Sequence, residues 1–286
     1  MHVNTAVLLT GGMSGAPTLR LSYVIPGEGK DSVNAVTSLG DEVFVLRDDN
    51  EQVEVYDAVS CTLQRHITVQ GLGVRACGLA ACAHYQCLYV SDDTFHNCSI
   101  HRVKLTGSSA VTKWYVASGP KGLSVNRAHN VVVSCKGADK LLEYTTHGYL
   151  VREICLQDDT EPWHAVQLST GDYVVSLWEP DVVSVVGVDG QVRHSYEQSQ
   201  TSDEGKMSGP MSLAVTKNGD IFVVDEYTDR ILSMNSSLSS VQQLTLPVDG
   251  GIEEPRGLCL DELRGQLYVG EYGGSYRVLV FDYMKR

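Results

Sequence analysis

Residues 209–232 read GPMSLAVTKNGDIFVVDEYTDRIL, and this stretch decides the fold. It contains three short apolar runs, separated by polar turns around residues 216–220 and 225–230. The runs are rich in Val, Ile, Leu and Phe, and Gly, Asn and Asp occupy the turns, which is the composition of β-strands and hairpins. Apolar residues do not follow a helical spacing over the length of a helix anywhere in the chain. The stretch therefore predicts three antiparallel strands.

The same pattern returns along the chain with a period of about forty residues. Its second clear copy covers residues 254–281, EPRGLCLDELRGQLYVGEYGGSYRVLVF, and a more polar fourth run follows the third in residues 191–196 and 240–244. Four strands per unit at this period describe the blade of a β-propeller. We count six units, whose first runs lie at residues 32–36, 77–81, 119–125, 161–166, 209–215 and 254–260.

The two ends of the chain are expected to meet in one blade. The sixth unit ends after its third run, at Phe281, and residues 18–24 form a lone strand-like run before the first unit. We predict that this run supplies the missing outer strand of the last blade, which closes the ring and limits exposed strand edges. The predicted organisation is an N-terminal lead-in over residues 1–17 and a single propeller domain over residues 18–286.

A signature recurs in these units: a Gly-Leu-x-Val start, a Val-x-Asp end of the second run, and Asp-x-x-x-x-Arg-Ile, which is clearest at residues 225–231. The units resemble NHL repeats, and residues 18–286 resemble a six-bladed NHL-type propeller. Residues 147–150 and 167–171 are similar to the C-terminal propeller of animal TRIM-NHL-like proteins. The resemblance implies an all-β fold with four-stranded antiparallel blades and a role in binding other molecules. The third and fourth units depart from it, because they lack the Asp and Arg pair.

Composition bears on the partner. The formal net charge is −13. Some TRIM-NHL propellers bind RNA through a positive face, whereas the overall field of this chain repels phosphate. No apolar run is long enough to cross a membrane. We expect a protein or peptide partner and a monomeric domain that does not bind a membrane, with RNA binding retained as a second alternative.

The chain has eight cysteines and no Cys-x-x-Cys spacing, so a zinc ribbon is not indicated. We expect most of them to be small buried residues of a cytoplasmic protein, with secretion as the alternative. Cys82 and Cys87 bracket a predicted hairpin turn at residues 83–86, and they are a candidate disulfide in an oxidising compartment.

Propeller geometry brings the start of each first strand and the end of each second strand to the mouth of the central channel. Aligning the units gives a ring of first-strand positions: Asn34, Gly78, Gly122, His164, Ser212 and Gly257, with neighbours Val33, Cys77, Lys121, Trp163, Met211 and Arg256. The second strands end at Arg47, Asp92, Cys135, Leu177, Asp225 and Glu271, with Trp178 and Glu226 next along.

These rings favour a binding surface over a metal-dependent enzyme. Six-bladed lactonase and paraoxonase propellers hold calcium, which takes six to eight oxygen ligands, and here the first ring offers only Asn34 and Ser212. His164 alone does not make a zinc site. We therefore predict no cofactor, no metal and no catalytic residue. The alternative is a small-molecule enzyme or ligand-binding propeller of the lactonase or strictosidine-synthase type, in which Glu226 or Glu271 acts alone in an apolar pocket.

Individual residues receive the following roles. We predict that Asp225 with Arg230, and Asp92 with Arg102, stabilise single blades, and that His164 either bonds a backbone carbonyl or binds the partner. Trp178 lies in a predicted loop on the channel face, where a large aromatic side chain is typical of interfaces. The predicted binding set is Lys121, Trp163, His164, Trp178, Glu226, Tyr227, Arg256, Glu271 and Tyr272.

Overall fold

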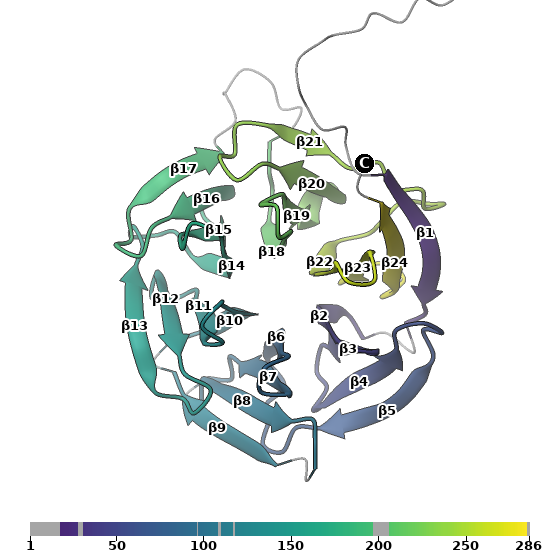
Figure 1. Cartoon of the computed structure of the whole chain (residues 1–286), viewed down its shortest axis with the longest axis horizontal. Coiled ribbons are helices and arrows are strands. Elements are labelled where there is room, and N and C mark those ends of the chain that lie inside the picture. The colour runs from purple at the N-terminus through teal and green to yellow at the C-terminus, as the bar shows by residue number, and fades with distance from the viewer. Residues whose placement is uncertain are drawn as a thin grey trace, which may run out of the picture.

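The computed structural model describes residues 18–27, 31–95, 97–107, 110–116, 118–196 and 206–284. The predicted lead-in over residues 1–17 lies outside these residues. The described chain forms six four-stranded antiparallel sheets that are arranged radially around a central channel (Figure 1). This confirms the predicted all-β, six-bladed propeller. Across the described part of the chain, no helix is long and apolar enough to cross a membrane.

We number the blades from the first complete one. Blade 1 contains β2 (Val33–Leu39), β3 (Glu42–Arg47), β4 (Gln52–Asp57) and β5 (Leu63–Thr68). Blade 2 contains β6 (Ala76–Cys82), β7 (Cys87–Asp92), β8 (Ser99–Lys104) and β9 (Val111–Tyr115). Blade 3 contains β10 (Pro120–Val125), β11 (Val131–Cys135), β12 (Lys140–Tyr144) and β13 (Leu150–Cys155).

Blades 4 to 6 complete the ring. Blade 4 contains β14 (Pro162–Gln167), β15 (Tyr173–Leu177), β16 (Val182–Val186) and β17 (Val192–Tyr196). Blade 5 contains β18 (Pro210–Val215), β19 (Ile221–Asp225), β20 (Arg230–Met234) and β21 (Val241–Gln243), with a short 3-10 turn η1 (Glu226–Thr228). Blade 6 contains β22 (Pro255–Asp261), β23 (Gln266–Glu271), β24 (Val278–Met284) and β1 (Thr18–Ile25).

The burial of each strand follows from its place in the blade. Both faces of the second strand are covered by neighbouring blades, so every residue of β19 (IFVVD) is buried. The outermost strand faces solvent, and most residues of β5 (LQRHIT) are exposed. This explains why the second strands read as continuous apolar runs and the fourth strands as polar ones.

The ring closes through its first strand, as predicted. β1 pairs antiparallel with β24, from Thr18 opposite Met284 to Ile25 opposite Val278. Leu19 is 7% exposed and joins a core cluster that also holds Phe281 and Phe222, so the closing strand contributes apolar burial as well as backbone hydrogen bonds. Strands that are far apart in the sequence thus stabilise one blade. β1 covers the edge of β24 that would otherwise be open to pairing with another chain.

All six inner strands have a register irregularity at their first residues. The shift falls between Pro162 and His164 in β14 and between Pro255 and Gly257 in β22, and equivalent shifts occur in β2, β6, β10 and β18. A β-bulge redirects the side chain of the extra residue. The six bulges lie on the face where the inner strands begin and the second strands end, which we call the mouth face. The opposite face is the far face.

Candidate functional site: the mouth of the channel

Two sets of residues meet at the mouth face. The first set is the bulge residues of the inner strands: Asn34, Cys77, Lys121, Trp163, Met211 and Arg256. The second set is the residues that directly follow the second strands: Asp48, Asp93, Lys136, Trp178, Glu226 and Tyr272. Because successive side chains of a strand point to opposite faces, the last strand residue points into its blade and the next residue is free to turn to the mouth.

Trp163 is at the centre of this surface. Three cationic groups lie near its ring: Lys121 Nζ at 5.5 Å, Lys136 Nζ at 5.8 Å and the Arg256 guanidinium carbon at 5.7 Å from the ring centroid. Lys121 and Lys136 come from the neighbouring blade 3, whereas Arg256 comes from blade 6 and reaches across the mouth to the same indole. Cation–π contacts of this kind are favourable within about 6 Å. Lys121, Trp163 and Arg256 thus lie together at the mouth, and their role in binding stays a prediction.

A row of aromatic rings extends outward from Trp163. Trp163 stacks on Trp178 with 5.7 Å between ring centroids, and Trp178 meets Tyr227 edge-to-face at 5.6 Å. Lys136 Nζ lies 4.4 Å from the Trp178 ring. Both indoles are partly exposed and Tyr227 is 56% exposed, so the row forms part of the surface of the molecule.

Each cation of the mouth has a carboxylate partner. Lys121 bonds Asp93 at 2.6 Å, and Lys136 lies 2.9 Å from Glu161. Arg256 donates to one Glu226 oxygen, Oε1, from Nε at 3.0 Å and from Nη2 at 2.5 Å. Opposite charges therefore alternate around the aromatic row.

Arg256 is held in place by residues of three blades. Besides Glu226 from blade 5, its guanidinium lies 3.2 Å from the ring centroid of Tyr272 in its own blade, and Nη1 contacts Asn34 Oδ1 of blade 1 at 3.5 Å. Asp48 links the last two residues, because it accepts from Asn34 Nδ2 at 3.0 Å and from the Tyr272 hydroxyl at 3.4 Å. This side of the mouth is consequently pre-organised.

Glu226 is a mouth carboxylate with a buried oxygen that no described residue binds. The residue is 1% exposed, and no described residue donates a hydrogen bond to its Oε2 atom. Burial raises the pKa of Glu226, and the charge of Arg256 opposes that shift in part. A buried carboxyl group with a free oxygen is able to accept or share a proton with a ligand that reaches it.

His164 lies deeper, inside the channel. Its Nε2 bonds the carbonyl of Leu123 at 3.0 Å, and its Nδ1 accepts the backbone N–H of Leu213 at 2.9 Å. Burial lowers its pKa to about 4, which keeps the imidazole neutral. His164 thus joins the inner strands of blades 3, 4 and 5, and both ring nitrogens already have partners. Of the two roles predicted for His164, bonding to the backbone and binding a partner, the structure supports the first.

In blade 3, the glycine of the Gly-Leu start is Gly122, and the neighbouring inner strand leaves no room for a side chain there. A Cβ atom on Gly122 would lie 2.5 Å from the Trp163 carbonyl and 2.7 Å from His164 Cδ2. Neighbouring inner strands therefore approach each other more closely than a side chain allows. Below this level a cavity of about 270 Å³ continues down the channel and is lined by the inner strands of all six blades, including Val36, Leu79, Leu123, Val166, Leu213 and Leu258.

Other predicted residues stabilise the blades and lie away from the mouth surface. Arg230 pairs with Asp225 at 2.8 Å, so the two side chains predicted to stabilise this blade are in contact. Glu271 belongs to the predicted binding set, but it is fully buried and pairs with Arg277 at 2.7 Å. We call such an ion pair, which joins the end of the second strand to the start of the third, a blade latch. Blade 1 has one of reversed polarity, from Arg47 to Glu54 at 2.8 Å.

The pairing predicted between Asp92 and Arg102 is wrong. Asp92 accepts from the backbone N–H of Gly73 and Thr94 at 2.8 Å and 3.0 Å, and it lies 3.8 Å from His101 Nε2. Arg102 stands one residue further along β8, opposite Tyr89, so alternation turns it to the other face of the sheet.

The cysteine pair shows the predicted register without the bond. Cys82 and Cys87 face each other across β6 and β7, and the structure has both as buried free thiols. The other six cysteines are also free, and Cys155 is exposed. Burial raises the pKa of the Cys82 thiol. Among the described residues, no three His, Cys, Asp or Glu side chains are grouped as metal ligands.

Three mouth residues were missed by the sequence reasoning. Asp48, Asp93 and Lys136 each follow the end of a second strand, in the same position as Trp178 and Glu226. The signal that identifies them is therefore positional: one residue beyond the second strand of every blade. Residue type alone does not distinguish them from other surface charges.

Comparison with known proteins places the fold and no more. Neither a protein-family model nor a curated protein matches the sequence. A structure described as streptogramin B lyase is similar with a TM-score of 0.65 and 11% identity, covering 96% of this chain and 100% of the other. Virginiamycin B lyase from Staphylococcus aureus gives 0.69 at 10% identity, with 93% and 100% covered.

A catalytically inactive variant of the same Staphylococcus aureus lyase, with quinupristin, gives a TM-score of 0.68 at 8% identity over 93% of this chain and 100% of the other. The similarity of these structures supports the six-bladed propeller fold. At such low sequence identity it assigns no role to any residue. These neighbours are lyases and not TRIM-NHL proteins, so the subfamily resemblance remains a prediction.

Proposed function

We propose that this protein is a binding module that recognises a peptide segment of a partner protein at the mouth face. The observation that carries the proposal is the aromatic row of Trp163, Trp178 and Tyr227, which is partly exposed and flanked by cations. Trp, Tyr and Arg are the residues that dominate protein interfaces, because they provide large contact area with few flexible bonds. The propeller holds this row on rigid strands.

A peptide fits the charges of this surface better than a nucleic acid does. Every cation described at the mouth has a carboxylate within 4 Å, and the whole chain carries a net charge of −13. A protein binds nucleic acid mainly through unpaired Lys and Arg side chains, which neutralise phosphates and release the counterions bound to them. A peptide, in contrast, offers both signs of charge and neutral backbone groups.

The proposal is tested by selecting peptides from a random phage-displayed library on the purified propeller. Peptides specific for the mouth should lose at least about tenfold in affinity, or about 1.4 kcal/mol, when Trp178 and Tyr227 are both changed to Ala. The matched control is Tyr149→Ala, because Tyr149 is 72% exposed and lies on the β12–β13 turn at the far face. Equal loss in both variants, or no loss in the double variant, contradicts the proposal.

A second candidate function is an acid–base enzyme for a small molecule, and Glu226 favours it. Its raised pKa and free oxygen are the properties of a general acid or base, and the structural neighbours are lyases. The test is incubation with quinupristin and with simple lactones and esters, followed by chromatography and mass spectrometry. Turnover that is lost in Glu226→Gln supports an enzyme, and turnover that persists in that variant removes Glu226 as the catalytic group.

A further inference from the structure

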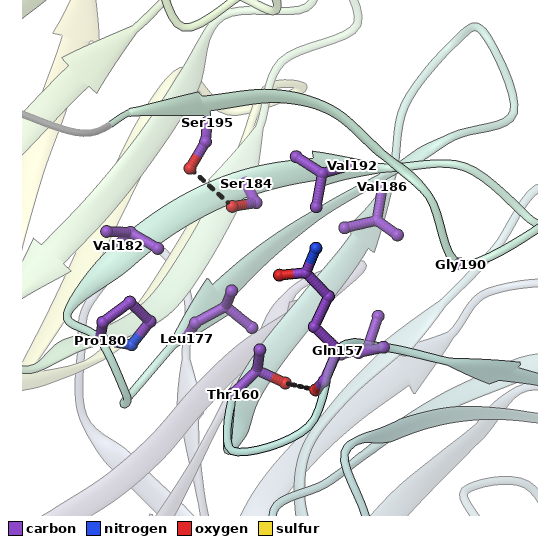
Figure 2. Close-up of a pocket in the computed structure, with 11 residues that line it drawn as sticks. Gln157, Thr160, Leu177, Pro180, Val182, Ser184, Val186, Gly190, Val192 and Ser195 are labelled. Carbon is purple, nitrogen blue, oxygen red and sulfur yellow. Dashed lines mark hydrogen bonds between the residues drawn. The ribbon is translucent and has the colours of Figure 1, made fainter.

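A second hollow lies beside the mouth, between blades 3 and 4. It is a cleft of about 170 Å³, and its wall consists mainly of one face of the blade 4 sheet, closed on the blade 3 side by the segment after β13 (Figure 2). Its lining is mostly aliphatic, and its polar side chains are Gln157, Thr160, Ser184 and Ser195. None of these lining residues is charged.

The floor of the cleft is the edge of a hydrophobic core. Leu177 and Val186 are 5% and 2% exposed and belong to the cluster between blades 3 and 4, against which Leu156 and Val182 also pack. Blade 3 leaves this edge uncovered because β13 ends at Cys155. Val192, on the outer strand of blade 4, is 41% exposed at the rim. The cleft therefore presents apolar surface to solvent next to a rigid core.

Polar groups occur at two places in this apolar wall. Ser184 and Ser195 share one hydrogen bond of 3.0 Å between their hydroxyls, which leaves the hydrogen of one hydroxyl available to an acceptor. The Gln157 side chain projects among the lining residues (Figure 2), and no hydrogen bond joins its amide to another described residue. The Thr160 hydroxyl is already used, because it donates to the Gln157 carbonyl at 2.9 Å.

Size and chemistry point to one occupant. A cavity of about 150 Å³ with apolar walls holds a benzene ring, and this cleft adds room for one polar atom. A phenol ring has an apolar body and a hydroxyl that both donates and accepts, which matches the Gln157 amide and the spare serine hydrogen. A charged side chain would lose its hydration with no ion-pair partner in the cleft.

The residues of the cleft and of the mouth are linked by two pairs of chain neighbours. Leu177 lines the cleft and Trp178 belongs to the aromatic row. On the other side, Thr160 lines the cleft, while Glu161 binds Lys136, whose ammonium lies over Trp178. A segment that crosses Trp178 is thus able to place one side chain in the cleft.

We propose that this cleft is a specificity pocket that takes a tyrosine side chain of the peptide bound at the mouth. The proposal rests on the proposed function for its partner, but the pocket itself is testable alone. The probe is N-acetyl-tyrosinamide, and its binding is followed by NMR of methyl-labelled Leu and Val. We expect shifts at the methyl groups of Leu177, Val182, Val186 and Val192, with a Kd on the order of millimolar for so small a ligand.

Two variants on one strand separate pocket binding from other effects. Ser195→Phe fills the cleft and should weaken binding at least about tenfold, whereas His194→Phe adds the same ring on the opposite face of β17 and should not change it. Gln157→Ala tests the polar match without disturbing the core: it should reduce the preference for N-acetyl-tyrosinamide over N-acetyl-phenylalaninamide. The N-acetyl amides of Lys and Glu should not bind.

The outcomes distinguish the two proposals. No shifts at the cleft methyls, or equal binding by Ser195→Phe and His194→Phe, overturns the pocket. Shifts that are lost in Ser195→Phe confirm the pocket. If, in addition, the affinity of the displayed peptides does not depend on Trp178 and Tyr227, the proposed peptide binding at the mouth is wrong and the pocket is still supported. Where both hold, the selected peptides should contain a tyrosine whose change to Ala weakens binding to the wild type and has no further effect in Ser195→Phe.

Discussion

Asp225 and Glu226 are neighbours in the chain, yet their carboxyl groups lie in two different regions of the molecule. Asp225 is inside blade 5, where it accepts from Arg230 Nε at 2.9 Å and from the backbone N–H of Ser208 at 2.7 Å. Glu226 lies at the mouth, where Arg256 binds one oxygen and the other has no partner among the described residues. Burial raises the pKa of both carboxyl groups.

The same change of location between two successive residues occurs at the end of every second strand: the last strand residue lies in the blade and the next lies at the mouth. In blade 6, Glu271 forms a latch with Arg277 and the next residue, Tyr272, contacts Arg256 at the mouth. In blade 4 there is no latch, because Leu177 joins the core, and the next residue is Trp178. The alternation of the strand therefore assigns one position to blade stability and the next to the mouth, where Trp178 is partly exposed and Glu226 is buried.

The largest expected effect is on a latch. Arg230→Ala leaves the Asp225 carboxylate buried without its cation, which should reduce the free energy of unfolding by about 3–5 kcal/mol. The control is Arg193→Ala, because that residue forms a solvent-exposed pair with Asp189 and exposed pairs contribute about 1 kcal/mol or less. Urea denaturation measures both. Equal stabilities of the two variants contradict the latch.

The next largest effect is at His164, in the channel wall. Its pKa is near 4 in the folded protein and 6.5 in a peptide, so unfolding takes up a proton between these values. Stability should fall as the pH drops from 6.5 to 4, by about 3 kcal/mol from this group. His164→Gln should be less stable at pH 7 but lack this part of the acid dependence. Denaturation curves of both proteins from pH 7 to 4 test it, and parallel pH profiles would disagree with a neutral buried imidazole.

A smaller effect is expected where the aromatic row meets solvent. Tyr227→Ala removes a ring that is 56% exposed, so stability should change by no more than about 0.5 kcal/mol. Affinity for peptides selected on the mouth should nevertheless fall several-fold, because the ring forms the end of the row. Calorimetry of unfolding and of binding on the same sample tests both parts. A loss of stability without a loss of affinity would place Tyr227 with the latches.

A small effect on stability is also expected at Glu226. Glu226→Gln removes a buried charge with one unused oxygen and should change stability at pH 7 by less than about 1 kcal/mol, whereas Asp225→Asn should destabilise by about 2–3 kcal/mol. A carboxyl group whose pKa is raised on folding stabilises the native state less as the pH rises from 4.5 upward. The stability of Glu226→Gln relative to the wild type should therefore increase from pH 4 to pH 7. A decrease over this range would show that Glu226 is well solvated or fully paired.

Most of the fold was predictable because it depends on patterns that one sequence contains. The period, the apolar runs and the lone strand at residues 18–24 predicted the blades and the closure by β1. The site was predictable where it follows from the same geometry, as for Lys121, Trp163, Trp178 and Arg256. Residue identity added little, since Asp48, Asp93 and Lys136 resemble ordinary surface charges and are recognised only by position.

The wrong assignments came from contacts that sequence spacing does not specify. Glu271 is the last residue of its second strand, as Asp225 is in blade 5, and it pairs with Arg277 inside the blade, whereas Glu226 lies one residue beyond its strand. Asp92 has His101 and two backbone N–H groups instead of Arg102, because the register of β7 and β8 decides which residue faces it. The cleft between blades 3 and 4 depends on where β13 ends, and no motif marks that point.

The most direct test compares peptide affinity in two variants under conditions where both are folded. Arg230→Ala affects the latch of blade 5, and the double change of Trp178 and Tyr227 to Ala affects the mouth. At low temperature, Arg230→Ala should bind the selected peptides within about twofold of the wild type despite its lower stability, and the double variant should bind at least about tenfold more weakly. Equal affinities in the double variant and the wild type, or an equal loss in both variants, would contradict the separation of latch and mouth.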